Sequence, residues 1–111
     1  MRITILFLSH LLLVCSLAFA ESSDVERFKP VMDHAVSEQK AGNHKAAIKL
    51  FKKVYSKSED LKREALLGLI ASLKDSKQWD DAVEILKLEI KMNPFVGEYR
   101  IWVAEVYLGA A

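Results

Sequence analysis

Few side chains in this sequence have both the type and the spacing that chemistry at a site requires. Beyond the first twenty residues, His34 and His44 are the only histidines, and neither has a second histidine or a cysteine at metal-ligand spacing. The adjacent carboxylates Asp80 and Asp81 stand at the expected start of a helix, where the helix dipole favours negative charge. No glycine-rich phosphate loop and no nucleophile elbow occurs. The sequence therefore predicts a non-enzymatic protein without a cofactor or metal site.

The most concentrated charge in the sequence is basic and lies between residues 40 and 63. Four of its lysines share one face of an expected helix, and we name them the basic face: Lys45, Lys49, Lys52 and Lys53. Two interpretations are open, a surface for an acidic partner, polysaccharide or anionic lipid head groups, and the solvated outer face of a helix. No aromatic residue is interleaved with these lysines, which argues against nucleic acid as a partner.

The first twenty residues have the features of a cleavable signal peptide. An almost wholly apolar run from Ile3 to Phe19 follows Met1-Arg2, and Ala18-Phe19-Ala20 gives the small-any-small pattern that precedes cleavage. The chain turns polar at once at Glu21. We therefore expect an exported protein, periplasmic or secreted, with cleavage after Ala20. An uncleaved membrane anchor is the alternative, but a spanning helix needs about 20 apolar residues and this run is shorter.

Cys15 raises a second alternative, a lipid-anchored protein. Val14 before it is bulkier than the small residue that such a leader requires, so cleavage after Ala20 is favoured. Cleavage removes Arg2 and the one cysteine, and it leaves 15 of the 16 basic side chains against 15 acidic ones. The mature chain then has no net formal charge, no disulfide and no transmembrane span. Its stability depends on apolar packing alone.

The rest of the sequence predicts an all-α fold. Residues 21–27 form a polar lead-in, and the stretches after it carry apolar residues at helical spacing. Polar or helix-breaking segments separate these stretches at 41–43, 56–60, 75–78 and 93–94. The third stretch begins at Leu61 and is apolar nearly all round, so it requires neighbours on both sides. No segment alternates with period two, so a sheet is not expected.

The sequence also repeats itself. Residues 42–51 align with residues 77–86, and 35 residues separate Ala47 from Ala82. A large apolar residue follows each of these alanines by one helical turn. Self-similarity at such a period is typical of repeat architectures, in which each unit is one pair of helices.

The residues that carry this repeat resemble those of the tetratricopeptide family, whose unit is two antiparallel helices of about 34 residues. Ala47 and Ala82 match its small residue at the helix crossing, Phe51 and Leu86 match the large apolar residue one turn later, and Pro94 matches the closing proline. The resemblance implies an α-solenoid of about two and a half repeats within residues 28–111. The repeats fall near 28–60, near 61–94 and, in part, at 95–111.

The resemblance is incomplete in several places. His34 and Glu38 stand where the family usually has an apolar and an aromatic residue, and Lys77 stands where glycine is common between helices. In the partial repeat, Ala104 occupies the small position and Tyr107 the aromatic one. A generic array of helical hairpins is therefore the alternative fold.

The resemblance also implies a binding site, because the first helix of each pair lines a concave groove in this family. The groove positions in this sequence are Lys29, Met32, Val36, Gln39 and Lys40, then Glu64, Leu67, Ala71, Lys74 and Asp75, then Glu98, Ile101, Glu105 and Leu108. Met32 and Val36 occupy positions that the family's carboxylate clamp fills with polar residues, so that activity is not implied.

These residues predict an exported scaffold that binds an extended or helical protein segment by apolar anchors. By analogy with exported modules of bacteria, a cell-envelope assembly or secretion system is the expected setting. The alternative function is a carbohydrate or anionic-surface binder that uses the basic face.

The last expected helix has no predicted neighbour on one side. Trp102, Val103, Val106 and Tyr107 give it an apolar face, and the sequence stops before a following helix. Arrays of this type generally need about three repeats. We therefore expect residues beyond Ala111, a partner chain or a second copy to cover residues 95–111.

Overall fold

Helices joined by short turns make up the described part of the chain. The computed structural model describes residues 23–111, and its helices are α2 (Val25–Lys40), α3 (His44–Lys57), α4 (Lys62–Asp75), α5 (Trp79–Met92) and α6 (Glu98–Ala110). No strand occurs among these residues. The predicted all-α fold is therefore confirmed.

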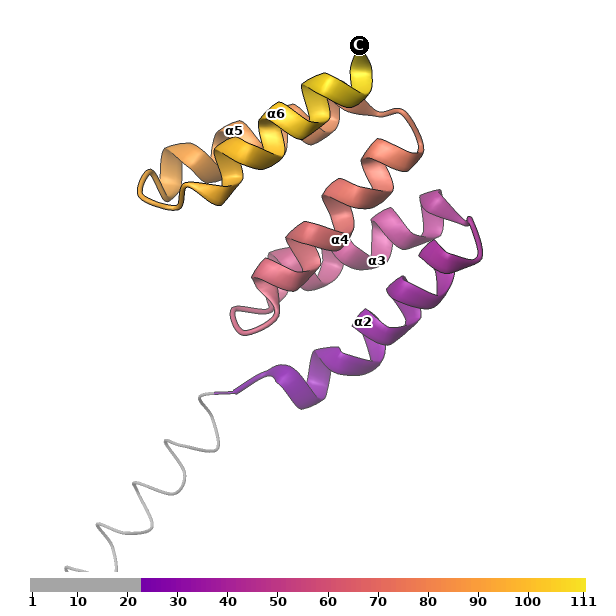
Figure 1. The fold of residues 1–111 in the computed structure, drawn as a ribbon. Coiled ribbons are helices and arrows are strands. Elements are labelled where there is room, and N and C mark those ends of the chain that lie inside the picture. The colour runs from indigo at the N-terminus through magenta and orange to yellow at the C-terminus, as the bar shows by residue number, and fades with distance from the viewer. Residues whose placement is uncertain (1–22) are drawn as a thin grey trace, which may run out of the picture.

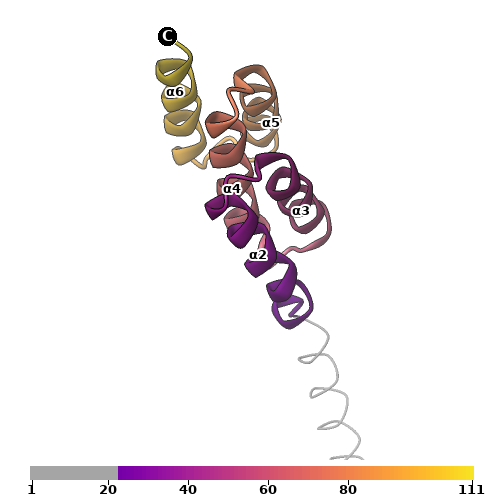
Figure 2. The ribbon, with the colours of Figure 1, turned by 90° about the vertical axis from the view of Figure 1, so that its right-hand side faces the viewer.

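The helices form antiparallel pairs that stack one after the other. Helix α3 packs closely against both α2 and α4, α5 packs closely against α6, and α4 contacts α5 less extensively (Figure 1). Seen from the side, α3 and α5 lie along one edge of the stack, whereas α2, α4 and α6 lie along the other (Figure 2). This arrangement is that of an α-solenoid.

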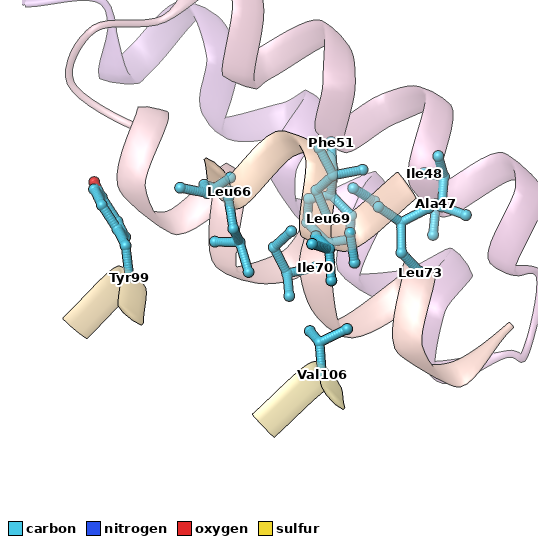
Figure 3. Packing of buried hydrophobic residues seen from close by; sticks show 13 residues of the cluster. Ala47, Ile48, Phe51, Leu66, Leu69, Ile70, Leu73, Tyr99 and Val106 are labelled. Carbon is cyan, nitrogen blue, oxygen red and sulfur yellow. The ribbon is translucent and has the colours of Figure 1, made fainter. Parts of the chain in front are cut away.

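Helix α4 is the centre of the core because it packs on both sides. Its Ala65 is buried with Phe28 of α2 and Val54 of α3. Its other buried face joins a larger cluster that includes residues of α5 and α6, in which Val106 points from α6 toward the α4 side chains, among them Ile70 (Figure 3). The all-round apolar pattern of this helix is thus explained by neighbours on both sides.

The first helix begins inside the polar lead-in. Helix α2 begins at Val25, so residues 25–27 of the predicted polar lead-in are helical. The amides of Arg27 and Phe28 each donate to the carbonyl of Asp24 at 3.1 Å, which closes the first turn. The carboxylate of Asp24 accepts hydrogen bonds from the Ser58 hydroxyl at 2.6 Å and the Glu59 amide at 2.9 Å. The bond from Ser58 lowers the pKa of Asp24, and these bonds hold the helix start against the turn after α3.

The turns within the two helix pairs have the same left-handed conformation at one residue. This residue is Gly42 in the first pair, with φ 83°, and Lys77 in the second, with φ 61°. A side chain with a Cβ adopts this conformation at a cost of roughly 1–2 kcal/mol, whereas glycine adopts it freely. Lys77 thus stands at a position that favours glycine, as the resemblance to the family indicated.

We expect Lys77→Gly to raise the free energy of unfolding by about 0.5–1 kcal/mol. Relief of the left-handed strain is partly offset by the greater entropy of glycine in the unfolded chain. Urea denaturation of the purified protein measures the change. Gly42→Ala is the matched control and should destabilise the protein, and a less stable Lys77→Gly variant would contradict the proposed strain.

Candidate functional site

The candidate groove lies on the edge of the stack formed by α2, α4 and α6 (Figure 2). None of its residues is fully buried. The half-buried ones are Met32, Val36, Gln39, Ala71, Lys74 and Glu98. The exposed ones are Lys29, Lys40, Glu64, Leu67, Asp75, Ile101, Glu105 and Leu108. All three helices therefore contribute accessible side chains to one edge of the molecule.

Apolar side chains run across this edge from helix to helix. Met32 and Val36 of α2 are partly buried against the core. Farther along, Leu67 of α4 is 49% exposed, and Ile101 and Leu108 of α6 are 60% and 77% exposed. Single exposed apolar residues are normal on a surface, and it is the recurrence of such residues at the groove positions of α4 and α6 that makes this edge the candidate interaction site.

Gln39 has a structural role that the sequence did not indicate. Its side-chain amide donates to the hydroxyl of Ser72 at 2.9 Å and to the carbonyl of Gly68 at 3.3 Å. Ser72 is fully buried in α4. The hydrogen bonds that Gln39 donates thus join α2 to α4. Gln39 is a candidate groove residue, and its side chain offers a ligand only its oxygen, as an acceptor.

Glu98 is likewise paired within the chain. The guanidinium of Arg63 donates to both of its carboxylate oxygens at 2.8 Å, which links the start of α4 to the start of α6. This pairing lowers the pKa of Glu98 and raises the pKa of Arg63. Bidentate geometry is the strongest form of such a pair, so the negative charge of Glu98 is largely compensated. Sequence reasoning missed Arg63, because its partner lies 35 residues away.

A buried carboxylate is the other polar feature that the sequence reasoning missed. Glu89 of α5 is only 1% exposed. It accepts a hydrogen bond from the hydroxyl of Tyr55 in α3 and a second from the side-chain amide of Asn93 at 3.2 Å. The aligned residue of the first pair, Val54, is buried and apolar. Glu89 thus stands at the repeat position where the first pair has a buried valine. This difference is the sequence signal that could have identified the polar contact between the pairs.

Alkaline pH should weaken the contact between Tyr55 and Glu89. Burial, with the hydrogen bond to Glu89, raises the pKa of Tyr55 above its usual value of 10.0. The folded protein therefore holds this proton more tightly than the unfolded chain, so the stabilisation is complete below about pH 10. It is lost as the pH rises from there through the folded-state pKa.

We expect Tyr55→Phe to be less stable than the parent at pH 8 by about 1–3 kcal/mol, because the buried carboxylate loses a donor. The difference in the free energy of unfolding between the two proteins should be smaller at pH 11. At that pH, Tyr55 ionises in the unfolded chain of the parent, which lowers the stability of the parent alone. Urea denaturation at both values tests this. Tyr107→Phe alters an exposed tyrosine and is the control. A pH-independent difference would contradict the prediction.

The structure does not bring together the other polar candidates. His34 is exposed on α2 beside Glu38, with 3.4 Å between its Nε2 atom and the carboxylate, while His44 begins α3. Asp80 and Asp81 are exposed in the first turn of α5. Among residues 23–111, no group of three potential ligands could hold a metal ion.

The basic face lies on the opposite edge from the groove. Lys45, Lys49, Lys52 and Lys53 are all exposed on α3, which runs along the edge that α5 shares (Figure 2). Within the described residues none of them forms an ion pair. The two candidate surfaces are therefore separate, and variants can address each of them alone.

Within residues 23–111, none of the helices has the length and hydropathy of a membrane-spanning segment. The predicted signal peptide at residues 1–20 lies outside the described residues.

Comparison with known proteins agrees with the helix pairs. A model of the tetratricopeptide repeat family matches residues 39–95, which is more than half of the chain and spans α3, α4 and α5. No curated protein sequence and no solved structure gives a significant match. The matched segment contains the small residues Ala47 and Ala82 and the closing residue Pro94, on which the resemblance rested. The chain therefore belongs to the tetratricopeptide repeat family.

Proposed function

We propose that this protein is an exported, non-enzymatic scaffold whose groove on α2, α4 and α6 binds a segment of a protein partner. Tetratricopeptide repeats are in general protein-interaction modules, and the exposed side chains at the candidate groove positions supply the specific support. The observation that carries the proposal is the exposed apolar row of Leu67, Ile101 and Leu108. Charged residues among the same groove positions, such as Glu64 and Glu105, are exposed as well.

The groove favours a segment with apolar anchors rather than one recognised by its charged end. Gln39 already uses its donors within the chain, and Glu98 is paired with Arg63. These two polar groove residues are thus engaged within the chain, while Leu67, Ile101 and Leu108 are the most exposed apolar side chains of the groove. An amphipathic helix or an extended strand with spaced apolar residues fits such a surface. The expected setting is a cell-envelope assembly or secretion system.

Selection from a random peptide library displayed on phage tests the groove. Peptides with spaced apolar residues should be enriched, and calorimetry should show that Leu67→Arg weakens their binding at least tenfold. Leu67 is about half exposed, so the substitution should leave the fold intact. Lys53→Glu on α3 is the control and should bind as the parent does. If Leu67→Arg binds equally well, the groove is not the site.

One observation favours a second candidate function, binding of an anionic polysaccharide or surface to the basic face. Helix α3 contains no acidic residue, and like charges one turn apart such as Lys45 and Lys49 destabilise a helix slightly. Replacement of all four lysines by glutamine should abolish retention on immobilised heparin if this function holds. Retention that is the same for parent and variant would dismiss it.

Export is part of the proposal and yields its own prediction. Because Ala18-Phe19-Ala20 precedes an abrupt polar switch, the secreted or periplasmic protein should begin with Glu21-Ser22-Ser23. N-terminal sequencing of exported material measures this directly. A lipidated Cys15, or an intact Met1 in the membrane fraction, would refute the cleavage site.

A further inference from the structure

Three large apolar side chains follow one another where α5 ends, and all three are exposed. Leu88 and Met92 lie one helical turn apart on the same face of α5, and they are 54% and 55% exposed. Phe95 is in the turn that follows, three residues beyond the end of the helix, and it is 99% exposed. We name Leu88, Met92 and Phe95 the apolar tip.

The apolar tip is not where the sequence placed the exposed apolar surface. The sequence led us to expect an uncovered face on the last helix, formed by Trp102, Val103, Val106 and Tyr107. In the structure Val106 is fully buried, and Trp102 and Val103 are packed against the same core. Only Tyr107 of the four is exposed. The most exposed apolar side chain of residues 95–111 is instead Phe95.

The first helix pair has polar residues at the positions of the apolar tip. The residues 35 positions earlier are Lys53, Lys57 and Asp60. Each of them is exposed although the second helix pair follows the first. The fold therefore leaves these positions in water even where another pair follows, so the exposure of the apolar tip does not depend on what comes after α6. Apolar residues at such positions add nothing to the core, and a cluster of them marks an interaction site.

The charges beside the apolar tip are basic. Lys87 and Lys91 each directly precede a residue of the tip, and both are exposed. Neither forms an ion pair within residues 23–111. The guanidinium of Arg100 donates to the carbonyl of Pro94 at 2.9 Å, which holds a third positive charge at the turn that carries the tip.

The carboxylates of α5 and α6 do not cancel this charge. Those exposed on α5 all lie in its first half, at Asp80, Asp81 and Glu84, and about 12 Å of helix separates the last of them from the final residue of α5. Glu89 is buried, where it accepts two hydrogen bonds. Glu98 of α6 is held in its bidentate ion pair. The exposed and unpaired charge at the end of α5 is therefore positive.

We propose that the apolar tip and its lysines attach this protein to the surface of a membrane that contains anionic lipids. Segments that lie in the membrane interface combine apolar side chains with basic ones. The apolar groups enter the boundary of the acyl chains, and the basic groups meet anionic head groups. The stems of Lys87 and Lys91 can follow the apolar surface while their ammonium groups stay among the head groups. A protein partner would need a pocket for the Phe95 ring, whereas a fluid lipid surface accepts an isolated ring.

The proposal rests neither on the groove nor on the basic face. Helix α5 lies on the edge of the stack opposite α2, α4 and α6, which carry the groove (Figure 2). A membrane bound at the end of α5 therefore leaves the groove accessible to a protein segment. The basic face lies on α3, and substitution of Phe95 changes no charge. Its effect is thus separable from any attraction of the basic face to an anionic surface.

Flotation of the mature protein, from Glu21 onward, with vesicles of phosphatidylcholine and phosphatidylglycerol tests the proposal. The parent should float with these vesicles and bind less to phosphatidylcholine alone. Phe95→Ser should lower the partition coefficient by about tenfold or more, because the ring no longer enters the interface. Leu67→Ser is the matched control, since it alters a groove side chain about as exposed as Leu88, and it should bind as the parent does. Circular dichroism establishes that both variants are folded.

Fluorescence of Phe95→Trp probes the geometry of the same contact. Trp79 and Trp102 are partly buried against the core, so the emission of the parent supplies the background. With vesicles that contain phosphatidylglycerol, the added emission should shift to shorter wavelength and be quenched by lipids brominated in their acyl chains. Leu67→Trp should show neither effect.

Three outcomes would overturn the proposal. One is equal vesicle binding by the parent and Phe95→Ser, and another is equal binding of the parent to vesicles with and without phosphatidylglycerol. The third is a parent that binds no vesicles and a Phe95→Trp emission that vesicles leave unchanged. A protein partner would then be the occupant of the apolar tip.

Discussion

Replacement of Gly68 by alanine is expected to lower the free energy of unfolding by about 1–3 kcal/mol. Gly68 lies in the middle of α4, where a Cβ would come within 2.4–2.8 Å of three carbon atoms of the Phe51 ring. That ring is 1% exposed and enclosed by the core, so it cannot move away freely. Alanine is the better helix former by about 1 kcal/mol, but a clash with three ring atoms outweighs this preference.

Thermal unfolding followed by circular dichroism measures the effect, and a loss of 1 kcal/mol corresponds to a fall of roughly 4–8 °C in a domain of this size. Phe51→Leu provides the control, because leucine is the residue that the second pair has at the aligned position, Leu86. In the Phe51→Leu background, Gly68→Ala should be neutral or stabilising. If the Gly68→Ala loss is equally large in both backgrounds, the ring contact is not its cause.

The second large effect is expected for Ala82→Leu, which should destabilise the protein by about 1–3 kcal/mol. Ala82 is 0% exposed and belongs to the core cluster that joins α4 and α5. Leucine adds three carbon atoms where the present packing leaves no accessible surface. The helices of the second pair must then separate or adopt strained side-chain conformations.

Ala46→Leu is the matched control for this substitution, since Ala46 is exposed on α3 directly before the buried Ala47. Its melting temperature should stay within a few degrees of the parent. An unchanged melting temperature for Ala82→Leu would mean that Ala82 is not at a close helix crossing. The alignment of the two helix pairs would then need a different register.

The all-α fold and the repeat were predictable from the sequence because their signals are local. Helical spacing of apolar residues and the break at Asn93-Pro94 depend on neighbours within a few positions. The predicted breaks at 41–43 and 93–94 fall between helices of the structure, whereas α3 extends through Lys57 into the predicted break at 56–60 and α4 ends at Asp75, inside the break at 75–78. The start of α2 at Val25 is stabilised by Ser58 and the turn after α3, which lie more than thirty residues away.

The partners of polar side chains were decided by the tertiary structure alone. Tyr55 and Glu89 are 34 residues apart, and Gln39 and Ser72 are 33 apart. Each pair comes together only because successive helix pairs stack with a fixed offset, and no local pattern encodes which side chains then meet. For the same reason the sequence identified Gln39 as a groove residue but not as a link between α2 and α4.

Helix α6 shows the same division. The sequence by itself determined that this helix has an apolar face, since composition and spacing are enough for that. Only the packing of α6 on α5 decided that Val106 is buried and that Arg100, Ala104 and Tyr107 are exposed. The rotation of a helix about its own axis is fixed by the neighbour it packs against, and an apolar pattern alone leaves that choice open until the neighbour is in place.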